Sequence, residues 1–383
     1  METVDDSFLS TLAYRPVITH AKAHRIGVIG AGRIAQQRQI PCYRNAGLEV
    51  VAAADVKQEA LDRAAENFGI TRGYLDYRDL LAQPDIDIVD ICTNTFPRKQ
   101  ITLDALAARK HVLSEKPFAR NYADAVEIVE AADASGVQLA VHQPTRWYYP
   151  CAIARELIMK GYLGDVFYIE LRMHGNQDTI YYEDPVTRWH TELKDHIFVE
   201  WGAHHFDLCR WFAGGETPRH ISAFGTVRGN EHFKSKMAVS ASCDYASGIV
   251  GCVSMDQASR FPRVGNTRIG MNFRVEGTQG VVAGDMVFDL AFESRINGGI
   301  SGQFDFSQPL SKEEDPFGYM WCASVRDGHL WPMAELIRSI HTGEKGLCSG
   351  RDNLHSVASY LAAMKSDELH RPVGPEEIVQ GLA

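Results

Sequence analysis

The stretch that decides the fold is "RIGVIGAGRIAQ", residues 25–36. It begins with a short apolar run typical of a buried β-strand, and the glycines that follow permit a tight turn. The residues after the turn, up to about Ala46, have helical character. Working outward from this stretch, the same succession of strand and helix recurs along the chain.

Later apolar runs of strand length are separated by segments with one apolar helical face. In "KQEALDRAAENFG", residues 57–69, Leu61, Ala64 and Phe68 share such a face. The glycine that closes this segment is a typical helix end. Strands that alternate with helices predict a parallel sheet covered on both faces. The further strands are expected within residues 48–55, 85–93, 110–117 and 137–142.

The glycine turn carries a dinucleotide-binding pattern, G-x-G-x-x-A, formed by Gly30, Gly32 and Ala35. The glycines allow close approach of a pyrophosphate, and the start of the following helix would face its phosphates. Asp55 ends the second apolar run, where a carboxylate would bond the ribose hydroxyls; capping the next helix is the alternative role. Because an aspartate repels a 2′-phosphate, NAD is expected rather than NADP.

Near residue 145 the pattern changes to strand-like runs joined by short turns, which predict an antiparallel sheet. Such a sheet needs cover, and Ile249, Val253 and Phe288 could meet either a second subunit or a helix of the same chain. The predicted fold class is α/β, with a doubly wound parallel sheet followed by a large, mostly antiparallel open sheet. The predicted division is residues 1–23 as an N-terminal extension, 24–145 as the NAD-binding domain and 146–383 as the substrate-binding and oligomerisation domain.

The fourth strand run ends in Glu115-Lys116-Pro117, and with this motif the chain resembles the glucose-fructose oxidoreductase and inositol dehydrogenase family, also called Gfo/Idh/MocA. Other similar segments are "RWYYP" at 146–150, "EGTQG" at 276–280 and "EWGAHHFD" at 200–207. The resemblance implies a Rossmann domain, a second domain on a mostly antiparallel sheet, and a dimer or tetramer formed through that sheet. It also suggests a cis Lys116-Pro117 bond.

Lys116 is the first candidate catalytic residue. The carboxyl end of a central parallel strand lies beside a bound dinucleotide, so an ammonium there can hold a substrate hydroxyl and the nicotinamide ribose. A surface lysine before a turn proline is the alternative interpretation. The residues expected to contact the cofactor are Gly30, Gly32, Arg33, Ile34, Asp55, Thr93, Asn94, Glu115 and Lys116.

The resemblance supplies the second catalytic group. Relatives often carry Asp-x-x-x-His where this chain has Glu200 and His204, which implies His204 as acid/base and Glu200 as a substrate contact. The glutamate is one methylene longer, so the geometry of relatives with aspartate does not transfer. On a helix, His196 would share a face with this pair, which could also suggest a metal site. Hydride transfer to NAD needs no metal, and none is expected.

Substrate contacts are expected from a polar, weakly periodic segment, residues 174–195, and from the arginine-aromatic segment before it. The aromatic residues of these segments can stack on sugar faces, although packing explains many of them equally well. The candidate substrate-binding residues are Arg146, Trp147, Asn176, Asp178, Arg188 and His190.

The composition limits the classes of partner and the cellular compartment that are expected. A formal net charge of −10 without clustered Lys and Arg argues against nucleic acid. The eight cysteines show no C-x-x-C spacing and indicate a reducing compartment. The first residues lack the apolar core of a signal peptide, and no segment suits a membrane span, so a cytoplasmic location is expected.

The sequence therefore predicts an NAD-dependent enzyme that removes hydride from a ring secondary alcohol of a sugar, glycoside or cyclitol. Two alternatives remain open at this stage. One is a glycoside-processing enzyme that keeps and recycles its NAD, and the other is a non-catalytic NAD-binding regulator. Lys116 and His204 together favour an enzyme over the regulator.

Overall fold

The computed structural model describes residues 2–259, 263–264, 267–268, 270–315, 318 and 320–381. The chain forms two compact units, each discontinuous in sequence. We call the first the parallel-sheet unit, which consists of Arg15–Tyr148 and Ser307–Leu354. The second, the mixed-sheet unit, consists of Met1–Tyr14, Tyr149–Phe306 and His355–Ala383.

The parallel-sheet unit is built on six parallel strands in the order β4-β3-β2-β5-β6-β7. This order reverses between β2 and β5, and ligands of doubly wound sheets bind at the carboxyl ends of the strands at such a point. The predicted parallel sheet is confirmed. Its strands are β2 (Arg25–Ile29), β3 (Glu49–Ala54), β4 (Gly73–Tyr74), β5 (Ile88–Ile91), β6 (His111–Glu115) and β7 (Leu139–His142).

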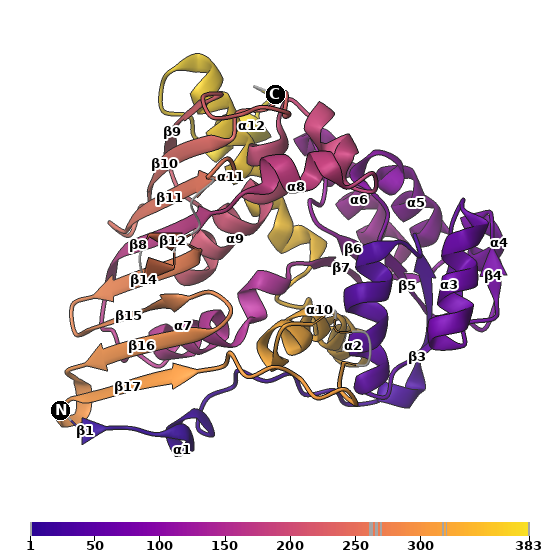
Figure 1. The fold of residues 1–383 in the computed structure, drawn as a ribbon, viewed down its shortest axis with the longest axis horizontal. Helices are drawn as coiled ribbons and strands as arrows, with labels where there is room; N and C mark the ends of the chain where they lie inside the picture. The colour runs from indigo at the N-terminus through magenta and orange to yellow at the C-terminus, as the bar shows by residue number, and fades with distance from the viewer. Residues whose placement is uncertain are drawn as a thin grey trace. The chain divides into compact units, whose positions relative to one another are not determined.

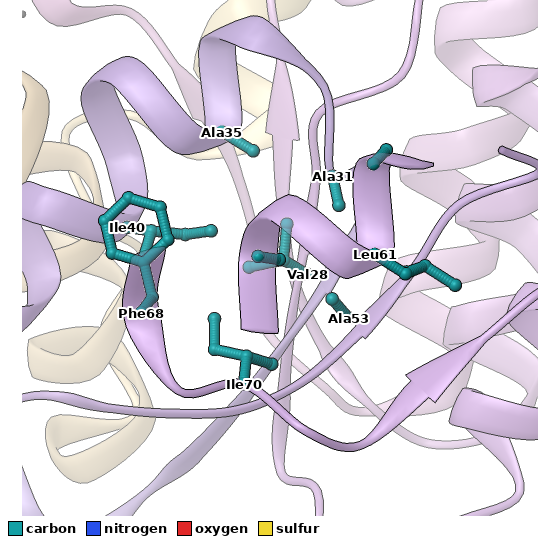
Figure 2. Packing of buried hydrophobic residues seen from close by; sticks show 10 residues of the cluster. Val28, Ala31, Ala35, Ile40, Ala53, Leu61, Phe68 and Ile70 are labelled. Carbon is teal, nitrogen blue, oxygen red and sulfur yellow. The ribbon is translucent and has the colours of Figure 1, made fainter. Parts of the chain in front are cut away.

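Small residues let the helices of this unit pack closely on the strands. Under the glycine turn, Ala31, Ala35 and Ala53 join larger side chains such as Phe68 in one buried cluster (Figure 2). Helix α3 then ends at Gly69 in the left-handed conformation, with φ of 65°, as predicted for this glycine. The helices are α2 (Ile40–Asn45), α3 (Gln58–Phe68), α4 (Tyr77–Leu81), α5 (Thr95–Ala107), α6 (Tyr122–Ser135) and α10 (Ala323–Thr342), with short turns η1 (Ala21–Ala23), η2 (Ala35–Gln39) and η3 (Pro144–Trp147).

The division into units differs from the predicted linear one. The predicted extension, residues 1–23, is shared between the two units at residue 14. Residues 146–148 and 307–354, which the sequence assigned to the second domain, group with the parallel-sheet unit. Helix α10 packs against β6, β7 and α2, and Val141 N donates to Cys348 O at 2.8 Å. A late segment of the chain therefore supplies part of the surroundings of the β6 and β7 strand ends.

The mixed-sheet unit contains a nine-stranded sheet in the order β1-β17-β16-β15-β14-β8-β11-β10-β9 (Figure 1). Pairing is antiparallel except between β1 and β17 and between β8 and β11. The predicted mostly antiparallel sheet is confirmed. Its strands are β1 (Glu2–Thr3), β8 (Val166–His174), β9 (His220–Thr226), β10 (Ala238–Asp244), β11 (Val250–Asp256), β14 (Met271–Gly277), β15 (Gly280–Asp285), β16 (Asp289–Ser294) and β17 (Ile300–Asp305); β12 (Arg263–Val264) and β13 (Thr267–Arg268) form a separate pair.

Helices of the same chain cover one face of this sheet. Val253 and Ile249 are buried, and α9 packs so closely on β11 that a Cβ at Gly251 would lie 2.7 Å from Cys209 Sγ. For these two residues, cover by the same chain is therefore the correct alternative. Along β10 and β11 the residues of the other face are exposed, as Ser240 and Val250 are, or half-buried, as Cys252 and Ser254 are. The helices and turns of the unit are α1 (Asp6–Leu9), α7 (Tyr149–Met159), α8 (Gln177–Glu183), η4 (Arg188–Glu192), η5 (Ile197–Trp201), α9 (Gly202–Phe212), η6 (Ile296–Gly298) and α12 (Pro375–Val379), and α11 (Gly350–Leu369) belongs to this unit from His355 onward.

The start of the chain packs on the mixed-sheet unit. Strand β1 adds to the edge strand β17, and Phe8 stacks on Phe292 with ring centroids 5.5 Å apart. Leu9 and Leu12 are buried. Within the described residues, no helix combines the length and the apolar character that crossing a bilayer requires.

Candidate active site

The glycine turn has the geometry that a dinucleotide needs. Gly30 has φ of +91°, and a Cβ there would lie 2.9 Å from Thr93 N. Both observations restrict the position to glycine. A Cβ at Gly32 would meet no atom of the described residues within 4 Å, apart from its own chain neighbours. The turn is thus tight at its first glycine and open at its second, where the pyrophosphate of a Rossmann ligand lies.

Polar groups surround this turn at the neighbouring strand ends. Asp55 Oδ1 accepts from Lys57 N at 2.9 Å, so the carboxylate helps to start α3. Asn94 caps α5 by accepting from Phe96 N at 3.1 Å. Thr93 Oγ1 is buried and has no hydrogen-bond partner among the described residues. These groups fit a bound dinucleotide, with Asp55 suited to the ribose and Thr93 offering an unused hydroxyl.

Arg98 of α5 forms hydrogen bonds with two loops that contain candidate site residues. Its Nη1 donates to Pro117 O at 2.6 Å, and its Nη2 donates to Thr93 O. The Lys116-Pro117 peptide bond is cis, as the resemblance suggested. The loops after β5 and β6 therefore share one buried guanidinium, which sequence reasoning did not single out.

Glu115 serves the protein's own structure. Its Oε1 accepts from Gln39 Nε2 at 2.6 Å and lies 3.2 Å from His142 Nδ1, and its Oε2 accepts from Lys116 N at 3.0 Å. Gln39 belongs to η2, a π-helical turn directly after the glycine turn. The sequence reveals only part of this group of contacts. Glu115 and His142 end strands that the sequence predicts to be parallel neighbours, but the π-turn that carries Gln39 has no clear sequence signal.

Asp90 of β5 lies close to this group. It is fully buried, accepts from Tyr43 Oη at 2.7 Å, and has a second oxygen without a hydrogen-bond partner among the described residues. Burial raises the pKa of Asp90 to about 6. A buried acid that holds its proton to an unusually high pH is thus a further feature of the parallel-sheet unit that the sequence did not reveal.

Arg146 and Trp147 are built into the parallel-sheet unit. Arg146 is 2 % exposed, and its guanidinium donates to Leu347 O at 2.6 Å and to Asp352 Oδ2 at 2.7 Å. Trp147 stacks on Trp331 with centroids 4.4 Å apart. These contacts give both residues a structural role, so Arg146 and Trp147 are not part of the proposed substrate site.

In the mixed-sheet unit, Glu200 and His204 lie where a π-helical turn passes into a helix. Glu200 is in η5 and is 5 % exposed, whereas His204 is in α9 and is half-buried. Gly202 N donates to Ile197 O, which is the five-residue spacing of a π-turn. The predicted four-residue face therefore does not continue regularly from His196 to His204. Such turns occur frequently at functional sites.

His205 and Asp207 have roles inside the mixed-sheet unit. The His205 Nδ1 lies 3.0 Å from Trp201 O, to which it can only donate, and burial lowers the pKa of His205 to about 4. Asp207 Oδ1 accepts from Ser356 Oγ at 2.6 Å and so anchors α9 to α11. These contacts give His205 a structural role and make Asp207 an anchor of the helix.

The remaining candidate substrate residues are spread over the segment 174–195. Asp178 is buried and its two carboxylate oxygens accept from Glu231 N and His232 N, each at 3.0 Å. Arg188 Nε donates to Tyr182 O at 2.6 Å. The ring of His190 stacks on Trp189 at 3.8 Å, and Asn176 forms a β-bridge with Ala258.

The alternative that His196, Glu200 and His204 form a metal site finds no support in the side chains. Among the described residues, the group with three potential ligand atoms within 4.8 Å of one another is Asp178, Glu231 and His232. The Asp178 oxygens already accept backbone hydrogen bonds.

Comparison with known proteins decides the family. Residues 24–143 match the model described as "Oxidoreductase family, NAD-binding Rossmann fold", and residues 152–283 match the "GFO/IDH/MocA C-terminal domain". The chain belongs to the Gfo/Idh/MocA oxidoreductase family. This confirms the resemblance and, with the parallel sheet, the NAD-binding Rossmann domain.

Several known proteins align along nearly the whole chain. A myo-inositol 2-dehydrogenase of Thermotoga maritima is 24% identical over 360 residues, which are 93% of this chain and 99% of the relative. A D-apiose dehydrogenase of Paraburkholderia graminis is 26% identical, with 90% and 89% covered. An Agrobacterium radiobacter oxidoreductase, solved with NAD+, L-tartaric acid and magnesium, has a TM-score of 0.80 at 22% identity, with 93% and 99% covered. This last likeness shows the fold.

Proposed function

We propose that the protein is an NAD-dependent dehydrogenase that oxidises a ring secondary alcohol of a sugar, glycoside or cyclitol. The observation that carries the proposal is Lys116 at the end of β6, on the same sheet edge as the glycine turn of β2. In a doubly wound sheet, that edge is where the reactive part of a bound dinucleotide lies. Bound NAD would accept the hydride that leaves the alcohol carbon.

In this proposal Lys116 and His204 have different roles at the substrate hydroxyl group. Lys116 donates to the hydroxyl oxygen and keeps it oriented, while His204, as a neutral imidazole, takes the hydroxyl proton when the C–H bond breaks. The products are a ketone, reduced cofactor and a protonated histidine, which returns its proton to water. Glu200 precedes His204 by one turn and is assigned to a substrate hydroxyl.

Asp55 supports NAD as the preferred cofactor over NADP. Its carboxylate stands at the carboxyl end of β3, the usual place for the residue that accepts from the ribose hydroxyls. A 2′-phosphate there would face a negative charge at short range. The bond from Lys57 N uses Oδ1, so a carboxylate oxygen is still available for a ribose hydroxyl.

The substrate class rests on the relatives and on the polar segment of the mixed-sheet unit. The two relatives described above are named dehydrogenases of an inositol and of a branched sugar. Arg188 and His190 lie on η4 beside Tyr182 and Trp189, and such a mixture of rings and polar groups suits a carbohydrate. We assign Arg188, His190 and Asn176 to the substrate, with Asp178 in support of the loop.

We further propose that the chain forms a homodimer or homotetramer through the outward face of the nine-stranded sheet. That face presents Phe224 and Val250, which are 67 % and 45 % exposed, among small residues such as Ser240 and Ser242. Exposed apolar residues on a broad sheet favour burial against a second copy.

A screen of inositols, hexoses and glycosides for reduction of added NAD tests the proposed function. We expect turnover with at least one polyol or sugar, and more NADH formed than enzyme present. Release of NAD from the denatured protein without net NADH production would favour the recycling mechanism instead. Failure of every substrate together with measurable NAD binding would favour the regulator and contradict the proposal.

A further inference from the structure

Three histidines meet at the edge of the parallel sheet that lies opposite the glycine turn. His20 and His24 flank the turn η1, and His341 lies in the last turn of α10. His24 directly precedes β2, whereas Gly30 directly follows it, so the length of this strand separates the histidines from the proposed cofactor site. All three histidines belong to the parallel-sheet unit, and the proposed reaction uses none of them.

Two of these histidines face each other through the same ring atom. The Nε2 atoms of His24 and His341 are 3.0 Å apart, and the two ring planes are inclined by 60°. The ring of His20 stacks on that of His341 with centroids 4.0 Å apart. His24 is 9 % exposed, whereas His20 and His341 are exposed. One nitrogen of the pair is therefore fixed inside the unit, and the other can be reached from solvent.

The surroundings of His24 favour a lone pair on its Nε2. Burial lowers the pKa of His24; the carboxylate of Asp87 opposes this shift, and His341 and His20 add to it, so the ring is neutral at pH 7. A neutral imidazole carries one N–H and one lone pair. Its Nδ1 is buried, has no hydrogen-bond partner among the described residues and lies 4.0 Å from Asp87 Oδ2. The negative charge of Asp87 attracts the proton to Nδ1, which leaves the Nε2 lone pair directed at His341.

The distance between the two nitrogens suits one class of metal ion. Bonds from a metal to imidazole are about 2.0 to 2.1 Å long, so an ion bound to both Nε2 atoms would form an angle of about 95° with them. Neighbouring ligands are about 90° apart in the square-planar and octahedral coordination typical of Cu²⁺ and Ni²⁺. Tetrahedral Zn²⁺ needs nitrogens about 3.3 Å apart. The exposed ring of His341 can turn toward an ion beside the line that joins the two atoms.

We propose that His24 and His341 bind one divalent transition-metal ion, with Cu²⁺ and Ni²⁺ preferred to Zn²⁺ and with water as the remaining ligands. The two ligands are 317 residues apart in the chain. An ion that joins them closes a long loop and stabilises the folded state of the parallel-sheet unit. This structural site goes beyond the proposed function and does not depend on it, because it lies at the other edge of the sheet.

The first test is the binding of Ni²⁺ to the intact protein without an affinity tag or cofactor, measured by isothermal titration calorimetry at pH 7.5. We expect one ion per chain at this site. His24→Gln and His341→Gln should each weaken binding by about 10-fold or more, since even loss of a group that only orients a metal ligand costs about 10-fold. Glutamine retains an amide that can form a hydrogen bond with the remaining ring.

His232→Gln is the matched control, because His232 belongs to the other group of potential ligands, with Asp178 and Glu231, in the mixed-sheet unit. Its affinity for Ni²⁺ should equal that of the wild type. A wild type that does not bind Ni²⁺ would show that the two nitrogens share only a proton, and would overturn the inference. Binding that survives in both His24→Gln and His341→Gln would overturn it as well. Tighter binding of Zn²⁺ than of Ni²⁺ would contradict the proposed class of ion.

The second test needs no variant. Electron paramagnetic resonance of the wild type with one equivalent of Cu²⁺ reports how many nitrogens the ion binds. We expect the splitting pattern of two imidazole nitrogens. A pattern from one nitrogen, or from none, would overturn the inference even if a variant fails to fold.

The third test measures the consequence for stability. Ni²⁺ should raise the midpoint of thermal unfolding of the wild type, by an amount that grows with the Ni²⁺ concentration, and should leave the midpoints of His24→Gln and His341→Gln unchanged. An equal rise in all three proteins would contradict the site. The Kd for NAD should be the same with and without Ni²⁺. Failure of the proposed dehydrogenase function would leave each of these measurements valid.

Discussion

The two units carry their candidate residues on different kinds of structure. In the parallel-sheet unit, Gly30, Asp55 and Lys116 each follow the end of a strand, and the register of the sheet places those ends on one edge. In the mixed-sheet unit, Glu200 and His204 lie where a π-turn passes into a helix. A regular sheet lets the sequence predict which residues share an edge, whereas an irregular turn does not.

Both units nevertheless have one feature in common. A π-helical turn, η2 in the first unit and η5 in the second, directly adjoins the candidate catalytic or cofactor residues. In η2 the turn directs Gln39 to Glu115. The comparison predicts that changes at the candidate catalytic residues of either unit reduce turnover, and that changes at Asp55 of the parallel-sheet unit alter cofactor binding.

The largest effect is expected in the mixed-sheet unit. His204→Asn removes the proton acceptor, and kcat in the oxidative direction should fall by about 10² to 10⁴ while the Kd for NAD stays unchanged. The adjacent His205→Asn is the control, since His205 bonds to Trp201 O and should tolerate an amide. Steady-state kinetics and cofactor titration of both variants test this, and equal losses in the two would contradict the role of His204.

A loss of about 10² or more is expected for Lys116→Met, which keeps the length of the side chain but removes its charge and its donors. The glycine turn is untouched, so NAD binding should largely survive. Single-turnover measurements on an established substrate separate binding from chemistry. Near-normal turnover would show that Lys116 is not part of the reactive centre.

A smaller change, about 10-fold, is expected in the ratio of the Kd values for NADP and NAD when Asp55 is replaced. Asp55→Ser removes the negative charge that a 2′-phosphate would meet, so NADP should gain relative to NAD. Calorimetric titration of both cofactors measures the ratio. Equal or tighter binding of NADP by the wild type would already disprove the proposed preference.

The last predictions concern stability rather than turnover, and the two effects differ in sign between the units. The pKa of Asp90 is raised from 3.8 to about 6, so folding becomes less favourable as pH rises through this window, by up to about 3 kcal/mol. Asp90→Asn should therefore stabilise the protein above pH 6.

The pKa of His205 is lowered from 6.5 to about 4, so stability is lost as pH falls between these values, again by up to about 3 kcal/mol. His205→Asn should remove that loss. Denaturant unfolding at pH 5 and pH 8 distinguishes the two signs, and a pH-independent stability difference for either variant would contradict its cause.

Most of the parallel sheet and the character of the second sheet were predictable, because alternating periodicity is a local signal. The grouping of residues 307–354 with the first sheet was not, since α10 acquires its place through contacts with strands two hundred residues earlier. The same holds within the site. Gly30 follows from its motif, but the engagement of Arg146 with Asp352 and of Glu115 with His142 depends on side chains that only folding brings together.

The most direct test of the central claim is the pH dependence of kcat/KM in the oxidative direction. A histidine that must be neutral to accept the hydroxyl proton produces a rate that rises with pH through one ionisation and then levels. The account predicts this rise in the wild type and in His205→Asn, and its absence in His204→Asn. A rise that persists in His204→Asn but disappears in His205→Asn would contradict it.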